Sequence, residues 1–341
     1  MTNLAIIGFG NVGQEVFQLA TEAEDFRVTS IATRDPARIV DNRCLQVPSC
    51  TISDLQDLSD NRWYKFADVA ILCGGSKNDL PIFGPYAVAR IDTIDSFDTH
   101  GLVGEYIDKN TGLPKNGYFQ MMDLAARSNG HRALVCQGWD PGLFSLMRGL
   151  FRSSLDEGAR IYTFYGLTKK GGLSMGHSDA LRQIAGVIDA RQFTHARPEA
   201  IELVRAGENP IFSPGDMIWR ECFVVTEGDK SDQLRIRDEI LTMPDYFSPY
   251  ETVVEFVSVE ELRVKHSTML HDGLVIAKSD NGLMEFRVEW ENNPKATARI
   301  MLSAARAIVK MKKAGFTGAF SPLSVAVADL LPTKAGILSF V

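Results

Sequence analysis

The sequence predicts an α/β protein in which a doubly wound parallel sheet is followed by a mixed α+β domain. Over the first 140 residues, short apolar runs alternate with helical patterns, which is typical of strand-helix-strand units. After Asp140 the strands become longer and alternate with period two. At 341 residues the chain is long enough for two domains, because one domain commonly has about 100 to 200 residues.

The first element is a strand over Leu4–Ile7, and the helix after it places apolar residues at helical spacing. A second helix covers Tyr118–Arg127. The other strands expected in this sheet are Val28–Ala32, Val69–Cys73, Ile91–Asp95 and Ala133–Cys136. The carboxyl ends of such strands open onto one edge, where ligands bind.

The second domain is expected to contain strands with one covered face, as the alternation of Trp219, Glu221, Phe223 and Val225 suggests for an antiparallel sheet. These strands are Ile161–Tyr165, Trp219–Val225, Val253–Val257, Leu274–Ala277 and Met284–Trp290. A last helix begins at Pro294, ends before Gly315 and is expected to pack back on the first domain. We therefore assign residues 1–137 and 305–341 to the first domain, and residues 138–304 to the second.

The composition excludes several function classes. A net charge of −7 gives no basic footprint for a nucleic acid. The N-terminus has no basic segment and no apolar run approaches the ~18 to 20 residues of a membrane span, so we expect a cytoplasmic protein without a membrane partner. The five cysteines are expected to be reduced thiols, because they suit neither a disulfide framework nor a zinc site. They are Cys44, Cys50, Cys73, Cys136 and Cys222.

A glycine pattern, Gly8-x-Gly10-x-x-Gly13, lies between the first strand and the first helix. Gly8 allows a tight turn, Gly10 allows close approach of phosphates, and Gly13 allows the helix to pack on the strand. The helix N-terminus then faces a pyrophosphate. This context predicts a Rossmann dinucleotide site, with Gly8, Phe9, Gly10, Asn11, Val12 and Gly13 in contact with the cofactor. The alternative is a purely structural glycine turn.

The second strand ends at Thr33-Arg34, where an NAD enzyme usually carries an acidic residue. A hydroxyl and a guanidinium suit a 2′-phosphate, which favours NADP. Asp35 argues for NAD, although its place before Pro36 also suits a turn. The third strand ends in Cys73-Gly74-Gly75-Ser76. We expect this segment to lie beside the nicotinamide ribose. The alternative is that it is a loop that needs glycine only for its own shape.

Three further segments together resemble the meso-diaminopimelate dehydrogenase family over nearly the whole chain. They are residues 138–142 (GWDPG), 173–182 (LSMGHSDALR) and 243–247 (MPDYF). The resemblance implies a homodimer of a Rossmann domain and a substrate domain. It also implies NADP-dependent oxidation of the D-configured carbon of meso-2,6-diaminopimelate to L-2-amino-6-oxopimelate and ammonia.

The resemblance implies that Asp98 and Asp140 are the acidic residues beside the reacting amine. Both follow strand-like runs of the first domain, and carboxylates there would bind the ammonium and help remove its proton. Read alone, Asp98 suits a helix cap and Asp140 suits a turn before Pro141.

The same resemblance implies a set of substrate-binding residues, in which Arg220 clamps the remote carboxylate and the 175–177 turn offers backbone N–H groups to the carboxylate on the reacting carbon. The set is Trp139, Tyr165, Met175, Gly176, His177, Thr194, Arg220, His271 and Asn293. Structural alternatives are a helix-start role for His177, a purely structural His271, and an N-cap role for Asn293 before Pro294.

The chain also departs from the family pattern near the expected pocket. Tyr165 stands where Trp is common, and 167–170 resembles an insertion. Residues 40–59 and 104–116 are longer than usual. These departures concern side-chain specificity more than reaction type. One alternative function is another NADP oxidoreductase of similar architecture, either a broader D-amino-acid dehydrogenase or a dihydrodipicolinate reductase-like enzyme. A non-catalytic NADP sensor is another.

Overall fold

The computed structural model describes residues 1–34, 36, 39, 51–54, 57–59, 61–244, 246–332 and 340. The chain forms two compact units, described separately here: unit 1 is Met1–Leu146 with Pro294–Val341, and unit 2 is Met147–Asn293. The sequence placed the two crossings at 137/138 and 304/305, whereas the structure places them at 146/147 and 293/294. The second difference has a simple reason. Helix α11 (Asn293–Lys313) is continuous and buries side chains from Pro294 to Met311, so it belongs almost entirely to unit 1.

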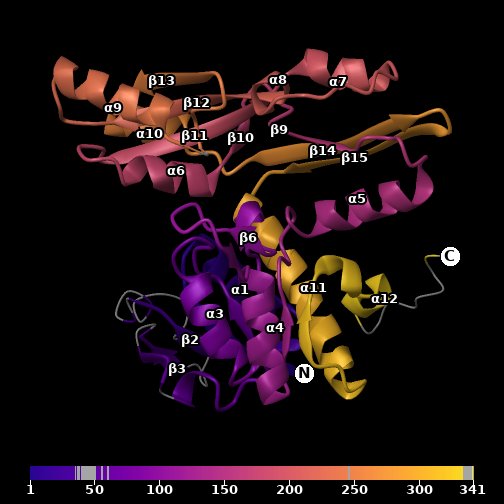
Figure 1. Cartoon of the computed structure of the whole chain (residues 1–341). Helices are drawn as coiled ribbons and strands as arrows, with labels where there is room; N and C mark the ends of the chain where they lie inside the picture. Colours follow the sequence, from indigo (N-terminus) through magenta and orange to yellow (C-terminus); the bar gives the residue numbers. More distant parts are fainter. Residues whose placement is uncertain are drawn as a thin grey trace. The chain divides into compact units, whose positions relative to one another are not determined.

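Among the described residues, the sheet of unit 1 has seven parallel strands in the order β16-β8-β5-β4-β1-β2-β3, which confirms the predicted doubly wound arrangement. Figure 1 labels helices α1, α3, α4 and α11 of this unit. Chain order reverses between β1 and β4, and such a switch point is where ligands bind in these folds. The strands are β1 (Thr2–Ile7), β2 (Phe26–Ala32), β3 (Thr51–Ser53), β4 (Val69–Leu72), β5 (Asp92–Asp95), β8 (Arg132–Leu134) and β16 (Gly318–Phe320).

Both faces of this sheet are covered by helices. Leu4 and Ile6 of β1 join the core formed with α1 and α11, whereas Ala5 and Ile7 join the core formed with α3 and α4, as the two-residue period of a strand requires. The helices are α1 (Asn11–Glu22), α3 (Leu80–Val88), α4 (Tyr118–Asn129), α11 and α12 (Val327–Leu330), with 3-10 turns at Asn61–Trp63, His100–Leu102 and Pro322–Ser324.

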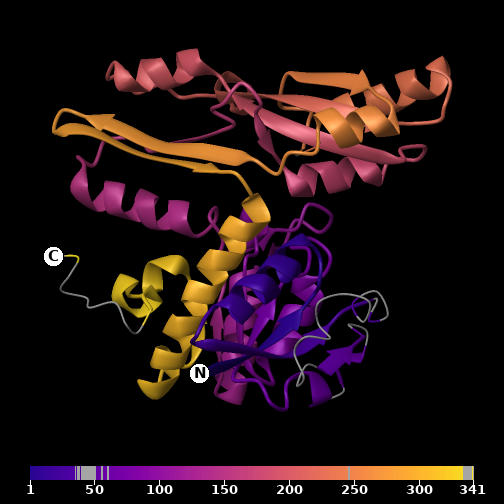
Figure 2. The ribbon, with the colours of Figure 1, turned by 180° about the vertical axis from the view of Figure 1, so that it is seen from behind.

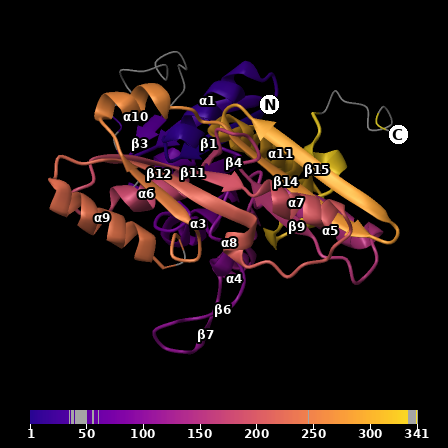
Figure 3. The same cartoon turned by 90° about the horizontal axis from the view of Figure 1, so that it is seen from above.

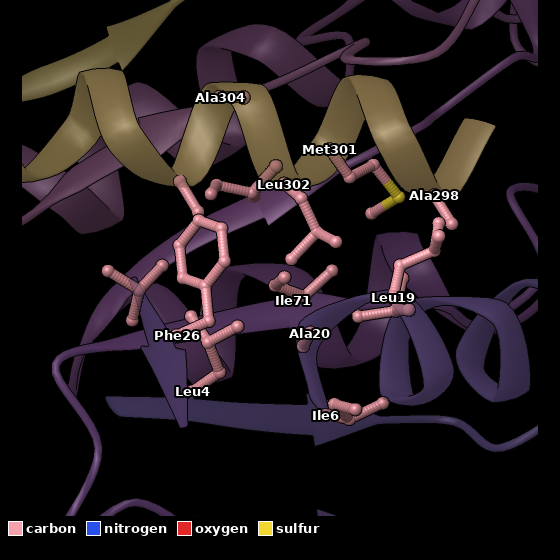
Figure 4. Close-up of a cluster of buried hydrophobic side chains, with 14 of the residues drawn as sticks. Leu4, Ile6, Leu19, Ala20, Phe26, Ile71, Ala298, Met301, Leu302 and Ala304 are labelled. Atoms are coloured by element: carbon pink, nitrogen blue, oxygen red, sulfur yellow. The ribbon is translucent and has the colours of Figure 1, made fainter. Parts of the chain in front are cut away.

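Helix α11 packs on unit 1, as the sequence predicted. Its residues Met301 and Leu302 belong to the same buried hydrophobic cluster as Phe26 and Ile71 (Figure 4). Seen from behind, the yellow helix runs beside the indigo strands at the start of the chain (Figure 2). Helix α11 therefore covers one face of the sheet of unit 1, although its residues 293–313 lie far from strand β1 in the sequence.

A two-stranded hairpin, β6 (Tyr106–Ile107) with β7 (Pro114–Lys115), occupies the 104–116 segment. It projects from the end of α4 as a narrow loop (Figure 3). The side chains of Ile107 and Leu113 are exposed there. This segment is thus an elaboration of unit 1 and contributes nothing to its core.

Unit 2 contains two sheets, and the expectation of one antiparallel sheet is wrong in this respect. The sheet β15-β14-β9 is antiparallel throughout, whereas in the sheet β10-β11-β12-β13 the last pair is parallel. A helix lies between β12 and β13, so the chain can return to the same end. The strands are β9 (Tyr162–Tyr165), β10 (Gly172–Leu173), β11 (Asp189–Ala196), β12 (Ile218–Val225), β13 (Thr252–Phe256), β14 (His271–Ser279) and β15 (Gly282–Trp290).

Helices cover the sheets of unit 2 as in other α+β folds. Leu181 of α6 and Ile236 of α9 pack with Cys222 and Val224 on one face of the four-stranded sheet, and Leu262 of α10 packs with Phe223 on the other. The helices are α5 (Leu143–Ser154), which begins in unit 1, α6 (Met175–Arg182), α7 (Pro198–Arg205), α8 (Pro214–Met217), α9 (Lys230–Thr242) and α10 (Val259–Lys265).

Cys73, Cys136 and Cys222 are free thiols, while Cys44 and Cys50 lie outside the described residues. Within the described part of the chain, no helix is long and apolar enough to cross a bilayer.

Candidate functional site

The glycine loop joins β1 to α1 in unit 1, and its geometry requires glycine. Gly8 has φ +92°, and a Cβ on Gly13 would lie 2.1 Å from the Gly8 carbonyl oxygen. A Cβ on Gly10 would meet no protein atom within 4 Å, so the protein leaves space over this residue. No side chain caps α1, whose first-turn amides lack helical acceptors. This cradle offers the open space and the amides without helical acceptors that a pyrophosphate needs.

The other predicted loop residues differ in exposure. Asn11 is exposed at the first position of α1, whereas Phe9 and Val12 are partly buried and pack against the core of unit 1. Phe9 contacts Phe17 edge-on, with ring centroids 5.9 Å apart. Phe9 and Val12 therefore offer a ligand mainly their backbone, and their side chains anchor the loop.

Thr33 and Arg34 follow β2 beside this loop, because the Gly8 N–H donates to the Ala32 carbonyl at 2.8 Å. Thr33 is buried, while the Arg34 side chain is 59% exposed and forms an ion pair with Asp79. The guanidinium has five donors, so it can keep this pair and still meet a phosphate. Asp35 lies outside the described residues.

The 73–76 loop follows β4, and Asp79 organises it. The Asp79 carboxylate accepts the Gly75 N–H at 2.9 Å, and a Cβ on Gly74 would lie 2.8 Å from the Asp79 Cβ. Glycine is therefore needed for the shape of this loop. Close approach of a cofactor is a further use that the same geometry allows. The Ser76 hydroxyl accepts the Asp98 N–H at 3.0 Å and so connects this loop to the next strand end.

Asp98 and Asp140 lie in loops after two neighbouring strands of unit 1, β5 and β8. Asp98 is exposed and precedes a 3-10 turn that begins at His100. Asp140 is partly buried, precedes the cis peptide bond to Pro141 and follows Trp139. Trp139 is buried against Phe144 of α5, with ring centroids 5.1 Å apart. Two carboxylates thus stand at the sheet edge where the glycine loop also lies.

Arg220 is the most unusual residue of unit 2. It is 4% exposed, and its Nε and Nη1 atoms are buried without a hydrogen-bond partner in the described part of the chain. The guanidinium lies 3.9 Å from the centroid of Tyr250 and 5.4 Å from that of Phe247. Among the described residues no carboxylate pairs with it, and burial lowers its pKa. A buried cation of this kind is costly unless an anion completes it.

The segment Met175-Gly176-His177 forms the first turn of α6. Ser174 occupies the N-cap position without a side-chain cap to the backbone, so the amides of this turn have no helical acceptor. His177 lies 5.2 Å from Tyr246 and 6.0 Å from Phe247, measured between ring centroids. Burial, followed by the charges of Arg220 and His271, lowers its pKa to about 3. The helix-start reading of His177 is thus correct in position, and the residue also faces the Arg220 site.

The remaining predicted residues of unit 2 gather around Arg220 through strand pairing. Thr194 is buried and pairs directly with Arg220 across β11 and β12. Gly172 pairs with Thr194, and a Cβ on Gly172 would lie 2.7 Å from Nδ1 of His271. Tyr165 contacts His271 edge-on at 6.2 Å.

Asn293 is the first residue of α11, and its N–H donates to the Met269 carbonyl at 3.0 Å. It therefore lies near the start of β14, where His271 begins the strand. Asn293 thus lies at the start of α11, where the N-cap role was expected.

Sequence reasoning missed several residues of these sites. Asp79 could have been found as a cap before Leu80-Pro81, but not as the partner of Arg34. Tyr250 belongs to no motif and meets Arg220 only through the fold. Asp272 is fully buried and accepts the N–H groups of Leu167 and Thr168 at 2.9 Å each, which fixes the 167–170 segment. Asp245 of the 243–247 motif lies outside the described residues.

Comparison with known proteins shows which family this chain resembles. A family model described as the diaminopimelic acid dehydrogenase C-terminal domain matches residues 138–292. The meso-diaminopimelate D-dehydrogenase of Acetivibrio thermocellus is 37% identical, over 97% of this chain and 95% of the relative. That of Ureibacillus thermosphaericus is 39% identical, over 96% of this chain and 95% of the relative.

Solved structures agree with the sequence relatives. The DAP dehydrogenase of Corynebacterium glutamicum in complex with DAP has a TM-score of 0.83 at 34% identity, over 98% of this chain and 96% of that one. An engineered D-amino acid dehydrogenase bound to NADP+ has a TM-score of 0.81 at 32% identity, over 99% and 98%. With identity above 30% over nearly the whole length, the chain belongs to the diaminopimelate dehydrogenase family.

Proposed function

We propose that this chain catalyses the NADP-dependent oxidative deamination of the D-centre of meso-2,6-diaminopimelate to L-2-amino-6-oxopimelate and ammonia. Bound NADP would supply the acceptor for the hydride that leaves the carbon carrying the amine. The amine loses a proton, and water converts the resulting imine to the ketone with release of ammonia. The same steps in reverse assimilate ammonia in diaminopimelate and lysine biosynthesis.

The residues of unit 1 have roles in cofactor binding and proton handling. The glycine loop holds the pyrophosphate through its backbone amides, and Thr33 and Arg34 bind the 2′-phosphate. Asp98 and Asp140 bind the reacting ammonium and help remove its proton, since two carboxylates can hold a cation and accept a proton in turn. Trp139 supplies an apolar wall beside them.

The residues of unit 2 recognise the substrate. The first-turn amides at Met175, Gly176 and His177 bind one carboxylate, as helix N-termini do for anions. Arg220 clamps the other carboxylate, and a guanidinium can do so with two parallel hydrogen bonds. Tyr165, Thr194, His271 and Asn293 provide the polar and aromatic contacts that select the stereoisomer.

The observation that carries the proposal is the pair of buried, unpartnered nitrogens of Arg220. A simple D-amino acid has one carboxylate, so it would leave either α6 or Arg220 without an anion. A two-headed amino acid supplies both. A cofactor sensor without chemistry gives no reason to keep a buried guanidinium of this kind.

The decisive assay follows NADPH formation at about 340 nm with meso-diaminopimelate and with D-lysine, which keeps both amino groups at the same spacing but lacks the second carboxylate. We expect a kcat/KM at least about 100-fold higher for meso-diaminopimelate, since the lost partner leaves Arg220 buried and unpaired. Equal turnover of both substrates would favour the broader D-amino-acid dehydrogenase. No turnover of either, with NADP still bound, would favour the sensor.

We also propose that the protein acts in the cytoplasm as a homodimer, as the family resemblance implies. Light scattering coupled to size-exclusion chromatography tests the second part. A mass near 38 kDa, that of one 37.7 kDa chain, would contradict it.

A further inference from the structure

Asp95 is a buried carboxylate that the proposed reaction does not use directly. It is the last residue of β5, and its side chain has no exposed surface. Its Oδ1 accepts the Phe97 N–H at 3.0 Å and the Cys136 N–H at 3.2 Å, while Oδ2 accepts the Tyr118 hydroxyl at 2.9 Å. Asp95 therefore joins the loop after β5 to the loop after β8.

The fold itself gains little from a charge at this position. Asp95 forms no ion pair with any described residue, and burial raises its pKa to about 6. Asp92, at the other end of the same strand, is equally buried but lies 2.7 Å from Arg132. The ion pair at Asp92 has an evident structural use, whereas the lone carboxylate at Asp95 calls for a different one.

The two loops that Asp95 joins carry the two proposed acid-base residues. Asp98 lies three residues after Asp95, and Asp140 lies four residues after Cys136. The loops also pass close to each other, because a Cβ on Gly138 would lie 3.5 Å from the Ser96 Cβ. In addition, the Gln137 N–H donates to the Asp95 carbonyl at 2.7 Å.

Cys136 shows that the second loop depends on this support. Its φ is 60°, a left-handed conformation that costs a non-glycine residue energy and persists only where its surroundings fix it. The Asp95 carboxylate binds its N–H group. Without that acceptor, the amide would be buried and unpaired, and the backbone would be free to leave this conformation.

We propose that Asp95 is a positioning residue that sets the separation of Asp98 and Asp140 by binding the backbone of both their loops. The inference rests on the proposed function of these two carboxylates. Catalytic groups must be held within fractions of an ångström, and a displacement of ~1 Å can cost about 100-fold in rate. The Tyr118 ring stacks on Phe97, with ring centroids 4.2 Å apart, and this contact holds the Tyr118 hydroxyl in place to donate to Asp95.

The test compares Asp95→Leu, which has a similar shape but no acceptor, with Asp95→Asn, whose oxygen can still accept both N–H groups. For Asp95→Leu we expect kcat with meso-diaminopimelate to fall about 100-fold, with the Kd for NADP within about twofold of the wild type. For Asp95→Asn we expect kcat within about fivefold and an unchanged pH profile. Asp92→Asn is the matched control: it should lower the melting temperature and leave kcat unchanged.

Hydrogen exchange gives a readout that does not depend on activity. Asp95→Leu should speed amide exchange in segments 96–98 and 136–140, and Asp95→Asn should not. If Asp95→Asn loses as much kcat as Asp95→Leu, the charge acts directly and the proposal is wrong. It is also wrong if Asp95→Leu keeps its kcat or exchanges like the wild type. A wild type that does not oxidise meso-diaminopimelate would instead overturn the proposed function, and the exchange experiment would still judge the positioning role.

Discussion

The two units differ in the groups that could bind an anion. In unit 1 the glycine loop presents backbone amides at the start of α1, and a Cβ on Gly10 would point into open space. In unit 2 the buried guanidinium of Arg220 has two nitrogens that no described residue hydrogen-bonds. Backbone amides cost the fold nothing when no ligand is bound, because water can reach them. A buried cation destabilises the ligand-free protein, but it discriminates strongly between ligands that do and do not neutralise it.

The largest expected effect comes from removing the buried cation. Arg220→Met should raise the KM for meso-diaminopimelate about 100-fold, or about 3 kcal/mol, and leave the Kd for NADP unchanged. The ligand-free variant should melt at a higher temperature, since Met fills the space without an unpaired charge. Steady-state kinetics and calorimetry measure the two effects. An unchanged KM would show that the distal clamp is elsewhere, and Arg220→Lys tests whether charge alone suffices.

The second effect concerns pH. The pKa of His177 is lowered to about 3 in the folded protein, against about 6.5 when unfolded. Between pH 6.5 and pH 3, His177 is protonated in the unfolded chain and neutral in the folded chain. The free energy of unfolding therefore decreases as the pH falls from 6.5 towards 3. The loss at pH 5 is about 2 kcal/mol.

Denaturant titrations at pH 7 and pH 5 should therefore show less pH dependence for His177→Asn than for the wild type. The exposed His100 provides the control variant, His100→Asn. Identical pH dependence in all three proteins would mean that His177 titrates normally.

A smaller effect is expected at the glycine loop. Gly10→Ala adds a methyl group that meets no protein atom but occupies the space proposed for phosphate. We expect the Kd for NADP to rise about 20-fold, equivalent to nearly 2 kcal/mol, with the melting temperature almost unchanged. Gly13→Ala, whose Cβ would collide with the Gly8 carbonyl, should lower both stability and binding. If Gly10→Ala binds NADP normally, the pyrophosphate does not lie there.

The smallest effect tests cofactor choice. Arg34→Ala should weaken NADP about tenfold and NAD less than twofold, because only NADP has the 2′-phosphate and the site is exposed. Asp79→Asn keeps an acceptor for the Gly75 N–H and should not weaken NADP. Fluorescence titrations with both cofactors measure this. Equal losses for NAD and NADP in Arg34→Ala would remove the 2′-phosphate contact from the proposal.

Prediction from sequence was most successful where the elements are local. The first strand was expected at residues 4–7 and is observed at 2–7, and the glycine turn and the helix after it lie where they were predicted. Periodicity and turn chemistry act within a few residues, so they are visible in the sequence. The last helix was predicted with its apolar face, which packs on unit 1 as expected. Strands β10 and β11 were missed, and β13 was expected to be antiparallel. Pairing in the four-stranded sheet joins distant segments, and local pattern carries no information about strand direction.

The sequence by itself determined that the first part of the chain forms a dinucleotide-binding domain, and its motifs indicated the family. Tertiary structure alone decided that Arg220 is buried with no acidic partner among the described residues, that Asp79 meets Arg34, and that Asp95 joins the loops of Asp98 and Asp140. The physical reason is the separation in sequence over which each feature is built. A glycine loop is built from neighbours along the chain, whereas the cost of a buried charge depends on everything that excludes water from it.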